Sequence, residues 1–371
     1  MQDSSKVNVL ISPLDWGIGH ATRCVPVINE LLKKNCNVII ASNGRSEEFL
    51  KKEYPLLKHI SLNAYNIKYT KSGSSLVFKV VLQIPRILKA IVKEHHLLKR
   101  IVENNNINLI ISDNRYGLWH KKVYSVFITH QLMIKMPVGF SFAEKIIHKI
   151  IGYFISKFDE CWIPDYHDAD NLSGDLSHKY KNEKNNFFIG PLSRFSNTDL
   201  FKDNIQKQID ILFLLSGPEP QRTIFETLIM NQVKNSSYKV VIVRGVTEKC
   251  EEEKLNENTV MYSHLSTEKM SELIDETKIV VARSGYSTVM DLLVLNAIAV
   301  LVPTPGQTEQ EYLAAYLVHK KLFYSISQNK FNINAVTTLL DNPLPRRTFI
   351  HKNCEILTKR IDKIAENIEK K

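Results

Sequence analysis

Short apolar runs alternate with longer amphipathic stretches along the first half of the chain. Apolar residues three or four positions apart predict a helix at residues 21–34, and a charged helix is expected at residues 46–52. Runs that are apolar throughout are typical of parallel strands covered on both faces. This half therefore predicts a parallel sheet with helices on both sides. The expected strands are residues 7–12, 37–42, 58–62, 107–113 and 123–130.

A second series of the same kind occupies the other half. The polar stretch 197–208 predicts a linker, so residues 1–196 and 209–350 are expected to form two Rossmann-like α/β domains facing each other across a cleft. Residues 351–371 have helical spacing and predict a C-terminal helix that packs back on the first domain. Ligands of such domains bind at the carboxyl ends of the strands. The expected strands of this half are residues 209–217, 238–245, 259–265, 278–285 and 297–303.

The composition excludes several classes of protein. Of 371 residues, 44% are hydrophobic and 24% are charged, which is ordinary for a soluble globular protein and excludes a disordered or collagen-like chain. We expect neither a membrane span nor a signal peptide, because no apolar run approaches the roughly 20 residues that cross a bilayer. The cysteines are scattered, without a C-x-x-C pair, which argues against a disulfide framework or a zinc site and favours the cytoplasm. They are Cys24, Cys36, Cys161, Cys250 and Cys354.

The excess positive charge lies in the first half. Residues 1–195 carry 27 Lys or Arg against 17 Asp or Glu, and residues 68–157 alone have a net charge of +11. Two basic amphipathic stretches, 87–101 and 146–155, are either helices that cover the sheet or a peripheral surface that lies on an anionic membrane. A nucleic-acid partner is not expected, since no aromatic stacking platform accompanies the basic residues. The apolar residues expected to enter the membrane are Leu76, Val77, Phe78, Phe140 and Phe142.

The loop after the first strand is a candidate for catalysis. Gly17 and Gly19 form a turn that opens a helix and lets backbone approach a ligand on the acceptor side. The third glycine of a dinucleotide-binding loop is replaced by Thr22, so that kind of site is weakly supported. His20, at the helix start, is favoured as a neutral imidazole and is the candidate general base, or it merely caps the turn. Asp15 is a candidate catalytic partner or a turn former.

Polar residues also end the two later strands of this half. Asp113 ends one strand, where a carboxylate points into the cleft or forms an Asx turn. The next strand ends at His130 and Gln131, which by the same reasoning belong to the acceptor side.

The second half offers a binding site for an anionic donor. Ser216 and Gly217 follow a strand and present turn amides to a phosphate, with Arg222 and Arg244 as candidate cations. The strongest local signal lies further on, where a strand stops at a glycine and a helix begins with free hydroxyls; helix capping is the alternative. Its residues are Arg283, Ser284, Gly285, Ser287, Thr288 and Asp291. The loop at residues 303–311 adds Gln307, Gln310 and Glu311, which suit sugar hydroxyls.

These motifs resemble the GT-B glycosyltransferases of family 28, the MurG-like and monogalactosyldiacylglycerol synthase-like enzymes. The resemblance covers most of the chain and is most specific at residues 282–293 and 302–315, with support from 17–20 and 127–131. It implies a UDP-sugar donor, such as UDP-GlcNAc or a UDP-hexose, on the second domain and an acceptor on the first. By position, Ser284, Gly285 and Thr288 hold the diphosphate, Asp291 the ribose, Gln310 and Glu311 the sugar, while His20 lies near the acceptor.

Three departures from the family pattern stand out. The first loop has fewer glycines than usual, Pro218 and Pro220 remove amide donors from the second, and the ribose carboxylate is Asp291 rather than Glu.

The predicted function is an inverting glycosyltransferase. His20 deprotonates the acceptor hydroxyl, and Asp15 or Asp113 orients it. Neither a metal nor another cofactor is expected, because helix amides stabilise the leaving diphosphate and the pair Asp168 and Asp170 lies away from the donor strands. The basic half favours a lipid or a lipid-linked glycan as acceptor, at the cytoplasmic face of a membrane. The alternatives are a sugar-nucleotide 2-epimerase of the same fold and a non-enzymatic nucleotide-sugar-binding or membrane-associated scaffold.

Overall fold

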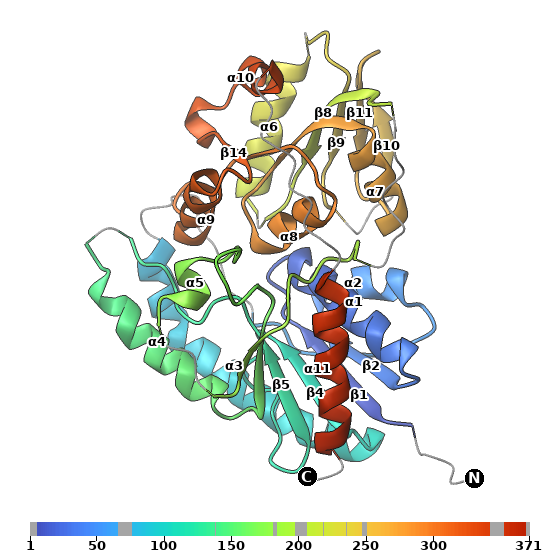
Figure 1. Ribbon diagram of the computed structural model, residues 1–371, viewed down its shortest axis with the longest axis vertical. Helices are drawn as coiled ribbons and strands as arrows, with labels where there is room; N and C mark the ends of the chain where they lie inside the picture. Colours follow the sequence, from blue (N-terminus) through green and yellow to red (C-terminus); the bar gives the residue numbers. More distant parts are fainter. Residues whose placement is uncertain are drawn as a thin grey trace.

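The computed structural model describes residues 6–65, 76–137, 139–180, 184–196, 206–217, 219–234, 236–246, 251–341 and 352–368. Within these residues the chain forms two sheets of seven strands, one in each half of an elongated molecule (Figure 1). The α/β class with two parallel sheets, predicted from the apolar runs, is confirmed.

The first sheet has the strand order β3-β2-β1-β4-β5-β6-β7, and all its described pairs are parallel. Its central strands are buried because helices cover both faces. The strands are β1 (Asn8–Pro13), β2 (Asn37–Ser42), β3 (Lys58–Ser61), β4 (Leu109–Asp113), β5 (Tyr124–Ile128), β6 (Glu160–Ile163) and β7 (Asn186–Phe188). The helices are α1 (Ile18–Lys33), α2 (Gly44–Glu53), α3 (Leu76–Asn105), α4 (Phe142–Ile155) and α5 (Asp175–His178).

The second sheet has the order β10-β11-β9-β8-β12-β13-β14, and only β10 runs antiparallel among its described strands. Its strands are β8 (Ile209–Leu214), β9 (Val240–Val243), β10 (Glu252–Lys254), β11 (Thr259–Tyr262), β12 (Thr277–Ala282), β13 (Ala299–Leu301) and β14 (Tyr324–Ser325). Its helices are α6 (Gln221–Val233), α7 (Thr267–Asp275), α8 (Tyr286–Val294), α9 (Thr308–His319) and α10 (Ile333–Thr338), with short 3₁₀ turns at η2 (Gln328–Lys330) and η3 (Leu339–Asp341).

The last helix, α11 (Lys352–Ile368), returns to the first domain and runs along it (Figure 1). Thr358 on this helix donates a 2.8 Å hydrogen bond to Glu30 of α1, and the Arg360 guanidinium donates to Glu160 of β6 at 2.8 Å. The first domain is therefore completed by the end of the chain. Most of the expected linker, residues 197–205, lies outside the described residues.

The number of strands and the start of the first helix differ from the expected ones. Four strands were not predicted: β6, β7, β10 and β14. Strand β6 was missed because it begins with a charged residue, Glu160. This side chain is nevertheless buried, because its charge is compensated by Arg360, a residue 200 positions later. The first helix begins at Ile18, three residues earlier than expected, directly after a glycine with φ of 106°.

Candidate functional site

The loops that end β1 and β12 meet where the two domains touch. Gly17 has a φ of 106°, a conformation that favours glycine, and it turns the chain into α1. Ser287, in the first turn of α8, donates a 2.8 Å hydrogen bond to the Gly19 carbonyl. A Cβ at Gly19 would lie 3.0 Å from Ser287 Oγ, so the second glycine permits this close approach. The predicted acceptor and donor loops are thus brought together.

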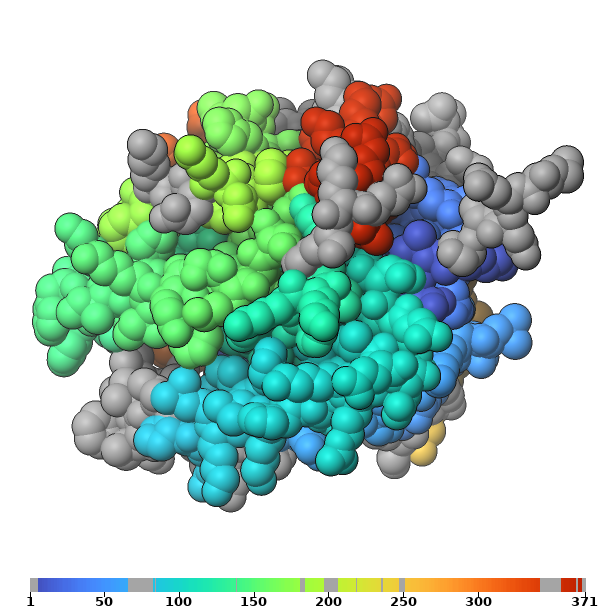
Figure 2. Space-filling view, turned by 90° about the horizontal axis from the view of Figure 1, so that it is seen from below, coloured from blue at the N-terminus to red at the C-terminus, as the bar shows by residue number. Residues whose placement is uncertain are grey.

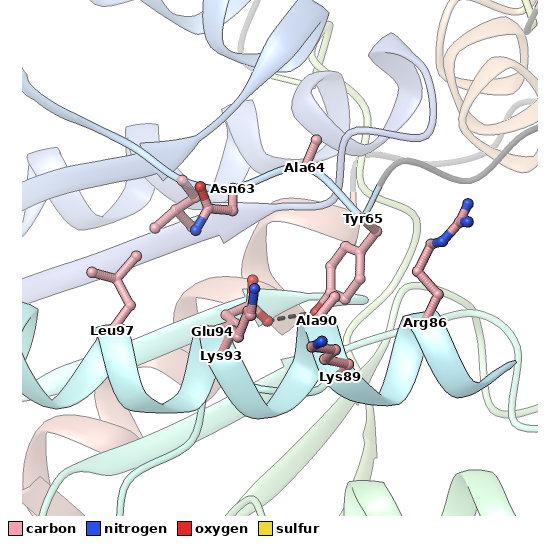
Figure 3. Close-up of a pocket in the computed structure, with 10 residues that line it drawn as sticks. Asn63, Ala64, Tyr65, Arg86, Lys89, Ala90, Lys93, Glu94 and Leu97 are labelled. Atoms are coloured by element: carbon pink, nitrogen blue, oxygen red, sulfur yellow. Dashed lines mark hydrogen bonds between the residues drawn. The ribbon is translucent and has the colours of Figure 1, made fainter. Parts of the chain in front are cut away.

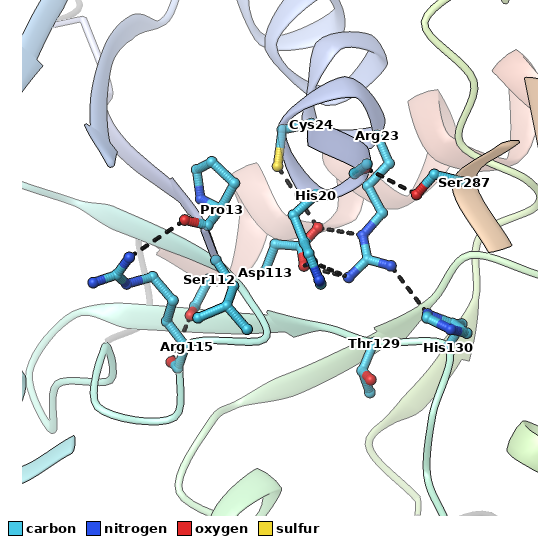
Figure 4. A network of polar contacts seen from close by, with 12 residues as sticks. Pro13, His20, Arg23, Cys24, Ser112, Asp113, Arg115, Thr129, His130 and Ser287 are labelled. Carbon is cyan, nitrogen blue, oxygen red and sulfur yellow. Dashed lines mark hydrogen bonds and ion pairs between the residues drawn. The ribbon is translucent and has the colours of Figure 1, made fainter. Parts of the chain in front are cut away.

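His20 is held by a buried carboxylate in the first domain. Its Nδ1 lies 2.7 Å from Asp113 Oδ1, at the end of β4 (Figure 4). The Arg23 guanidinium donates to both Asp113 oxygens, and its Nη2 lies 2.8 Å from His20 Nδ1. His20 Nε2 has no hydrogen-bond partner in the part of the chain that the structure describes, and the side chain is 15% exposed. With its proton on Nδ1, His20 donates to Asp113 and keeps the Nε2 lone pair available.

The protonation states suit a general base. Burial and the Arg23 guanidinium lower the pKa of His20 below its ordinary value, although Asp113 opposes them. Burial would raise the pKa of Asp113, but Arg23, followed by His20, outweighs it and lowers that pKa to about 2. At neutral pH the site therefore holds an ionised carboxylate that orients a neutral imidazole.

The network continues from Arg23 into the second domain. Arg23 Nη1 lies 3.0 Å from His130 Nδ1, and His130 Nε2 lies 2.8 Å from Glu309 Oε1 on α9. The imidazole of His130 stacks on Tyr286, with ring centroids 4.3 Å apart and planes 2° from parallel. Burial opposes ionisation of Glu309, but the hydrogen bonds from His130 and Gln131 lower its pKa. Polar contacts thus connect the ends of β4 and β5 to the start of α9.

Asp15 takes a different part from the one expected beside His20. Its Oδ1 accepts a 3.3 Å hydrogen bond from the Ser46 amide, and its Oδ2 accepts one of 3.2 Å from Asn43 Nδ2. Both partners lie at the start of α2, so Asp15 caps that helix. The structure places Asp113, rather than Asp15, on the His20 ring.

The start of α8 is linked to the start of α9. Ser284 Oγ donates a 2.8 Å hydrogen bond to the Gln310 carbonyl, and Gln310 Oε1 accepts one of 2.9 Å from the Thr304 amide. Gln307 is the N-cap residue of α9, and Glu311 accepts from the Gly306 amide at 2.9 Å. The predicted donor loops are therefore assembled into one unit around the amino end of α8.

Comparison with known proteins identifies the second half. Residues 212–368 match the glycosyltransferase family 28 C-terminal domain. The second domain is a family 28 glycosyltransferase domain.

A distant homologue extends the similarity beyond that domain. It is the UDP-N-acetylglucosamine–N-acetylmuramyl-(pentapeptide) pyrophosphoryl-undecaprenol N-acetylglucosamine transferase of Sulfurihydrogenibium sp. (strain YO3AOP1), 23% identical over 235 residues. The match covers 60% of this chain and spans 61% of the relative's length. The expected similarity to family 28 is confirmed for residues 212–368.

Solved structures show that the whole chain has the GT-B fold. The glycosyltransferase of kitacinnamycin has a TM-score of 0.62 at 14% identity, over 98% of this chain and 99% of that one. MurG of Acinetobacter baumannii has a TM-score of 0.53 at 12% identity, and the match covers 99% of this chain and 100% of that one. The UDP-GlcNAc 2-epimerase from Neisseria meningitidis, bound to UDP-GlcNAc, has a TM-score of 0.58 at 13% identity, and the match covers 96% of this chain and 100% of that one. The predicted GT-B architecture is confirmed, and transferases and epimerases share it.

Within the family 28 domain, three of the expected cations have protein partners. Arg283 is 1% exposed and donates to the backbone carbonyls of residues 221, 302 and 303 and to the Gln328 side chain. It therefore positions loops instead of meeting a donor. Arg222 pairs with Glu219 at 2.6 Å and with Glu226, and Arg244 pairs with Glu226 at 2.9 Å. Two carboxylates thus offset the charge expected to meet a diphosphate.

Asp291 of the same domain lies against the chain that leads out of the first domain. Ser193 Oγ donates to its Oδ1 at 2.6 Å, and Arg194 Nε lies 3.9 Å from its Oδ2. Burial raises the pKa of Asp291 to about 6, and Arg194 opposes this only in part. The expected ribose ligand is therefore already engaged through one oxygen.

The amino end of α8 itself remains open. Gly285 precedes the helix, and a Cβ there would meet only Thr288 Oγ1, at 3.9 Å. The amides of a first helical turn lack partners within the helix and attract anions. Gly217, with a φ of 100°, and Ser216 follow β8, and a Cβ at Gly217 would meet nothing within 4 Å among the described atoms.

Sequence reasoning missed Arg23, Tyr286 and Glu309. Arg23 lies one helical turn after His20, on the face that α1 turns toward β4. Glu309 directly precedes Gln310, which was predicted in its place. An arginine three residues after a candidate base was a visible signal, but nothing along the chain indicated that Glu309 meets His130. In the described residues, no group of three or more His, Cys, Asp or Glu side chains is placed to hold a metal ion. Of the pair Asp168 and Asp170, the Asp168 side chain accepts a hydrogen bond from the Asp170 amide within a turn.

Proposed function

We propose that the protein is an inverting glycosyltransferase that moves a sugar from a UDP-sugar to an acceptor hydroxyl. The observation that carries the proposal is the neutral, Asp113-oriented His20, which lies where α1 contacts the open amino end of α8. A base and an anion-binding helix start are the two groups that such a transfer needs. Family 28 membership of the second domain supports the nucleotide-sugar donor.

The reaction is a single displacement. The acceptor oxygen attacks the anomeric carbon of the sugar from the side opposite the diphosphate, while its proton passes to His20 Nε2. The bond between the anomeric carbon and the diphosphate oxygen breaks, and the nucleoside diphosphate leaves with both electrons. Amides of the first turn of α8, around Ser287 and Thr288, stabilise the negative charge that develops on it. Asp113 stabilises the imidazolium that forms.

We further propose that the acceptor is lipid-linked and that the first domain docks on a membrane. Helix α4 is apolar on two sides: Ile151 and Ile155 are buried, whereas other apolar residues face outward. We call this outward set the apolar ridge: Phe140, Phe142, Ile146, Ile150 and Tyr153, which are 53–71% exposed. The exposed Lys145, Lys149 and Lys157 flank it. An apolar ridge with flanking cations suits the surface of an anionic bilayer.

Figure 2 looks onto this end of the molecule, where the surface of α4 (green) lies beside that of α3 (blue to cyan). Helix α3 buries Ile91 and Leu98 but exposes Leu88 and Val92. No helix in the described part of the chain is long and apolar enough to cross a bilayer. The described residues therefore offer this face as a peripheral contact. The side chains of Leu76, Val77 and Phe78, also expected to enter the membrane, lie outside the described residues.

The test is turnover with a panel of UDP-sugars, with and without a lipid extract, read as UDP release and as change of the sugar. Release that depends on lipid, and falls about 100- to 10,000-fold in His20→Gln, supports the proposal. The matched control is His319→Gln, an exposed histidine on α9 that keeps full activity. Conversion of the UDP-sugar to an epimer without lipid assigns the 2-epimerase instead. Full activity of His20→Gln removes the base assignment.

A further inference from the structure

A groove of about 350 Å³ lies between the segment that follows β3 and one face of α3, and His20 is not among the residues that line it (Figure 3). Residues 62–65 form one wall. The other wall carries three cations of α3, Arg86, Lys89 and Lys93. We call this the basic groove.

The three cations share one face of the helix because they are three and four residues apart. All are exposed, and none makes an ion pair or a hydrogen bond with the described residues. Within the part of the chain that the structure describes, the positive charge of these three side chains is therefore not compensated by an ion pair.

Glu94 is the carboxylate among the described residues that line the groove, and it is already neutralised. Its Oε1 accepts a 2.6 Å hydrogen bond from Arg115 Nε, and its Oε2 accepts one of 2.5 Å from the Tyr65 hydroxyl. Arg115 is 1% exposed and also donates a 3.0 Å hydrogen bond to the Asn63 carbonyl, in the other wall of the groove. Glu94 thus compensates a buried arginine, and the charges of Arg86, Lys89 and Lys93 have no counter-ion among the described residues.

We propose that the basic groove binds a phosphate group. Lysine ammonium groups and an arginine fork are the donors that bind phosphate in proteins, and the volume admits one or two phosphoryl groups. The phosphate comes either from a soluble phosphorylated molecule or from a phospholipid headgroup. The second source fits the position of the groove, since Ile91 and Tyr65 pack in one cluster with Phe154 of α4, the helix that carries the apolar ridge.

The test compares two variants that lose the same charge. The groove variant is Arg86→Gln, Lys89→Gln, Lys93→Gln. The control variant is Lys99→Gln, Arg100→Gln, Lys121→Gln, three exposed cations that do not line the groove. Thermal unfolding establishes that both are folded. Binding of inorganic pyrophosphate is measured by calorimetry, and binding to phosphatidylcholine vesicles with added phosphatidic acid by sedimentation, without donor or turnover, so that the result is independent of the transferase proposal.

Each cation close to an anionic group strengthens binding about fivefold, so the groove variant binds on the order of 100-fold more weakly than wild type. The control variant stays within a few-fold. Selective loss of pyrophosphate binding assigns a soluble phosphorylated ligand, and selective loss of vesicle binding alone assigns a lipid headgroup. Equal losses in the two variants, or no binding by the wild type in either assay, overturn the proposal.

Discussion

Asp113→Asn probes the charge balance of the domain junction. The amide has nearly the shape of the carboxylate, so packing at the end of β4 is kept while the negative charge is removed. Arg23 is 1% exposed and donates to both Asp113 oxygens, so in the variant its guanidinium is buried without a counter-ion. We expect loss of stability and, because His20 loses the acceptor for its Nδ1 proton, loss of turnover.

Two arguments give the size of the loss in unfolding free energy expected for Asp113→Asn. Leaving one partner of a buried ion pair unpaired costs about 3–5 kcal/mol of unfolding free energy. The pKa of Asp113 is about 2 against an ordinary 3.8, which corresponds to about 2 kcal/mol of stabilisation at neutral pH. Since the folded pKa is depressed, this stabilisation is present above the unfolded pKa and is lost as pH falls through the folded pKa. The wild type therefore weakens between about pH 5 and pH 2 through this residue, and the variant lacks that component.

The assay is urea unfolding at neutral and acidic pH for the wild type, Asp113→Asn, and the double variant Arg23→Met, Asp113→Asn. The double variant removes both charges, so it is expected to be more stable than Asp113→Asn alone. A cost below about 1 kcal/mol for Asp113→Asn, or a double variant less stable than the single one, would refute the assignment of Asp113 as the counter-ion of Arg23.

Three further predictions test the site and the membrane face. The rate of transfer rises with pH through the pKa of His20, and the midpoint of the rise lies below the ordinary histidine pKa of 6.5, because burial and Arg23 lower that pKa. A pH–rate profile measures the midpoint, and a midpoint above 6.5 contradicts the prediction. Phe142→Ser with Ile146→Ser weakens vesicle binding by on the order of 100-fold, since each of the two buried apolar side chains contributes about 1.5 kcal/mol, whereas Leu56→Ser, at an apolar residue 97% exposed elsewhere, leaves sedimentation unchanged. Glu309→Gln weakens a hydrogen bond across the domain junction and raises KM for the donor more than it lowers kcat; unchanged steady-state kinetics contradict a role for this contact.

The fold was predictable because its signal is local. Central strands such as β1, β4 and β12 are buried on both faces, so each appears in the sequence as an unbroken apolar run. The strand β6 was missed because its Glu160 is satisfied by Arg360 of α11, and no local pattern reveals a partner so distant in the chain.

The site was predictable only in part, because the contacts of its side chains involve residues far apart in the sequence. The positions of Asp113, which ends β4, and of His20, which begins the helix after β1, follow from topology, since carboxyl ends of parallel strands share one edge. The partner that a side chain contacts does not follow from topology. Arg283 was expected at the donor because it ends β12, yet it is 1% exposed and its donors meet loop carbonyls and Gln328. Arg23 was not expected at all, although it sets the charge states of His20 and Asp113.

The proposed proton transfer depends on the tautomers of the two histidines at the junction. Arg23 has donors only, so His130 must accept at Nδ1 and carry its proton on Nε2, which it donates to Glu309. The Asp113 carboxylate accepts hydrogen bonds from Arg23 and from His20 Nδ1, so its oxygens are not available to take a proton from the acceptor. His20 Nδ1 lies 2.7 Å from Asp113 Oδ1 and 2.8 Å from Arg23 Nη2, and it can either donate to Asp113 or accept from Arg23. The proposed base uses the first tautomer, which has the proton on Nδ1 and the lone pair on Nε2. The same Arg23 charge that keeps His20 neutral before transfer also disfavours the imidazolium afterwards, so the proton taken from the acceptor is readily released and the base is restored for the next turnover.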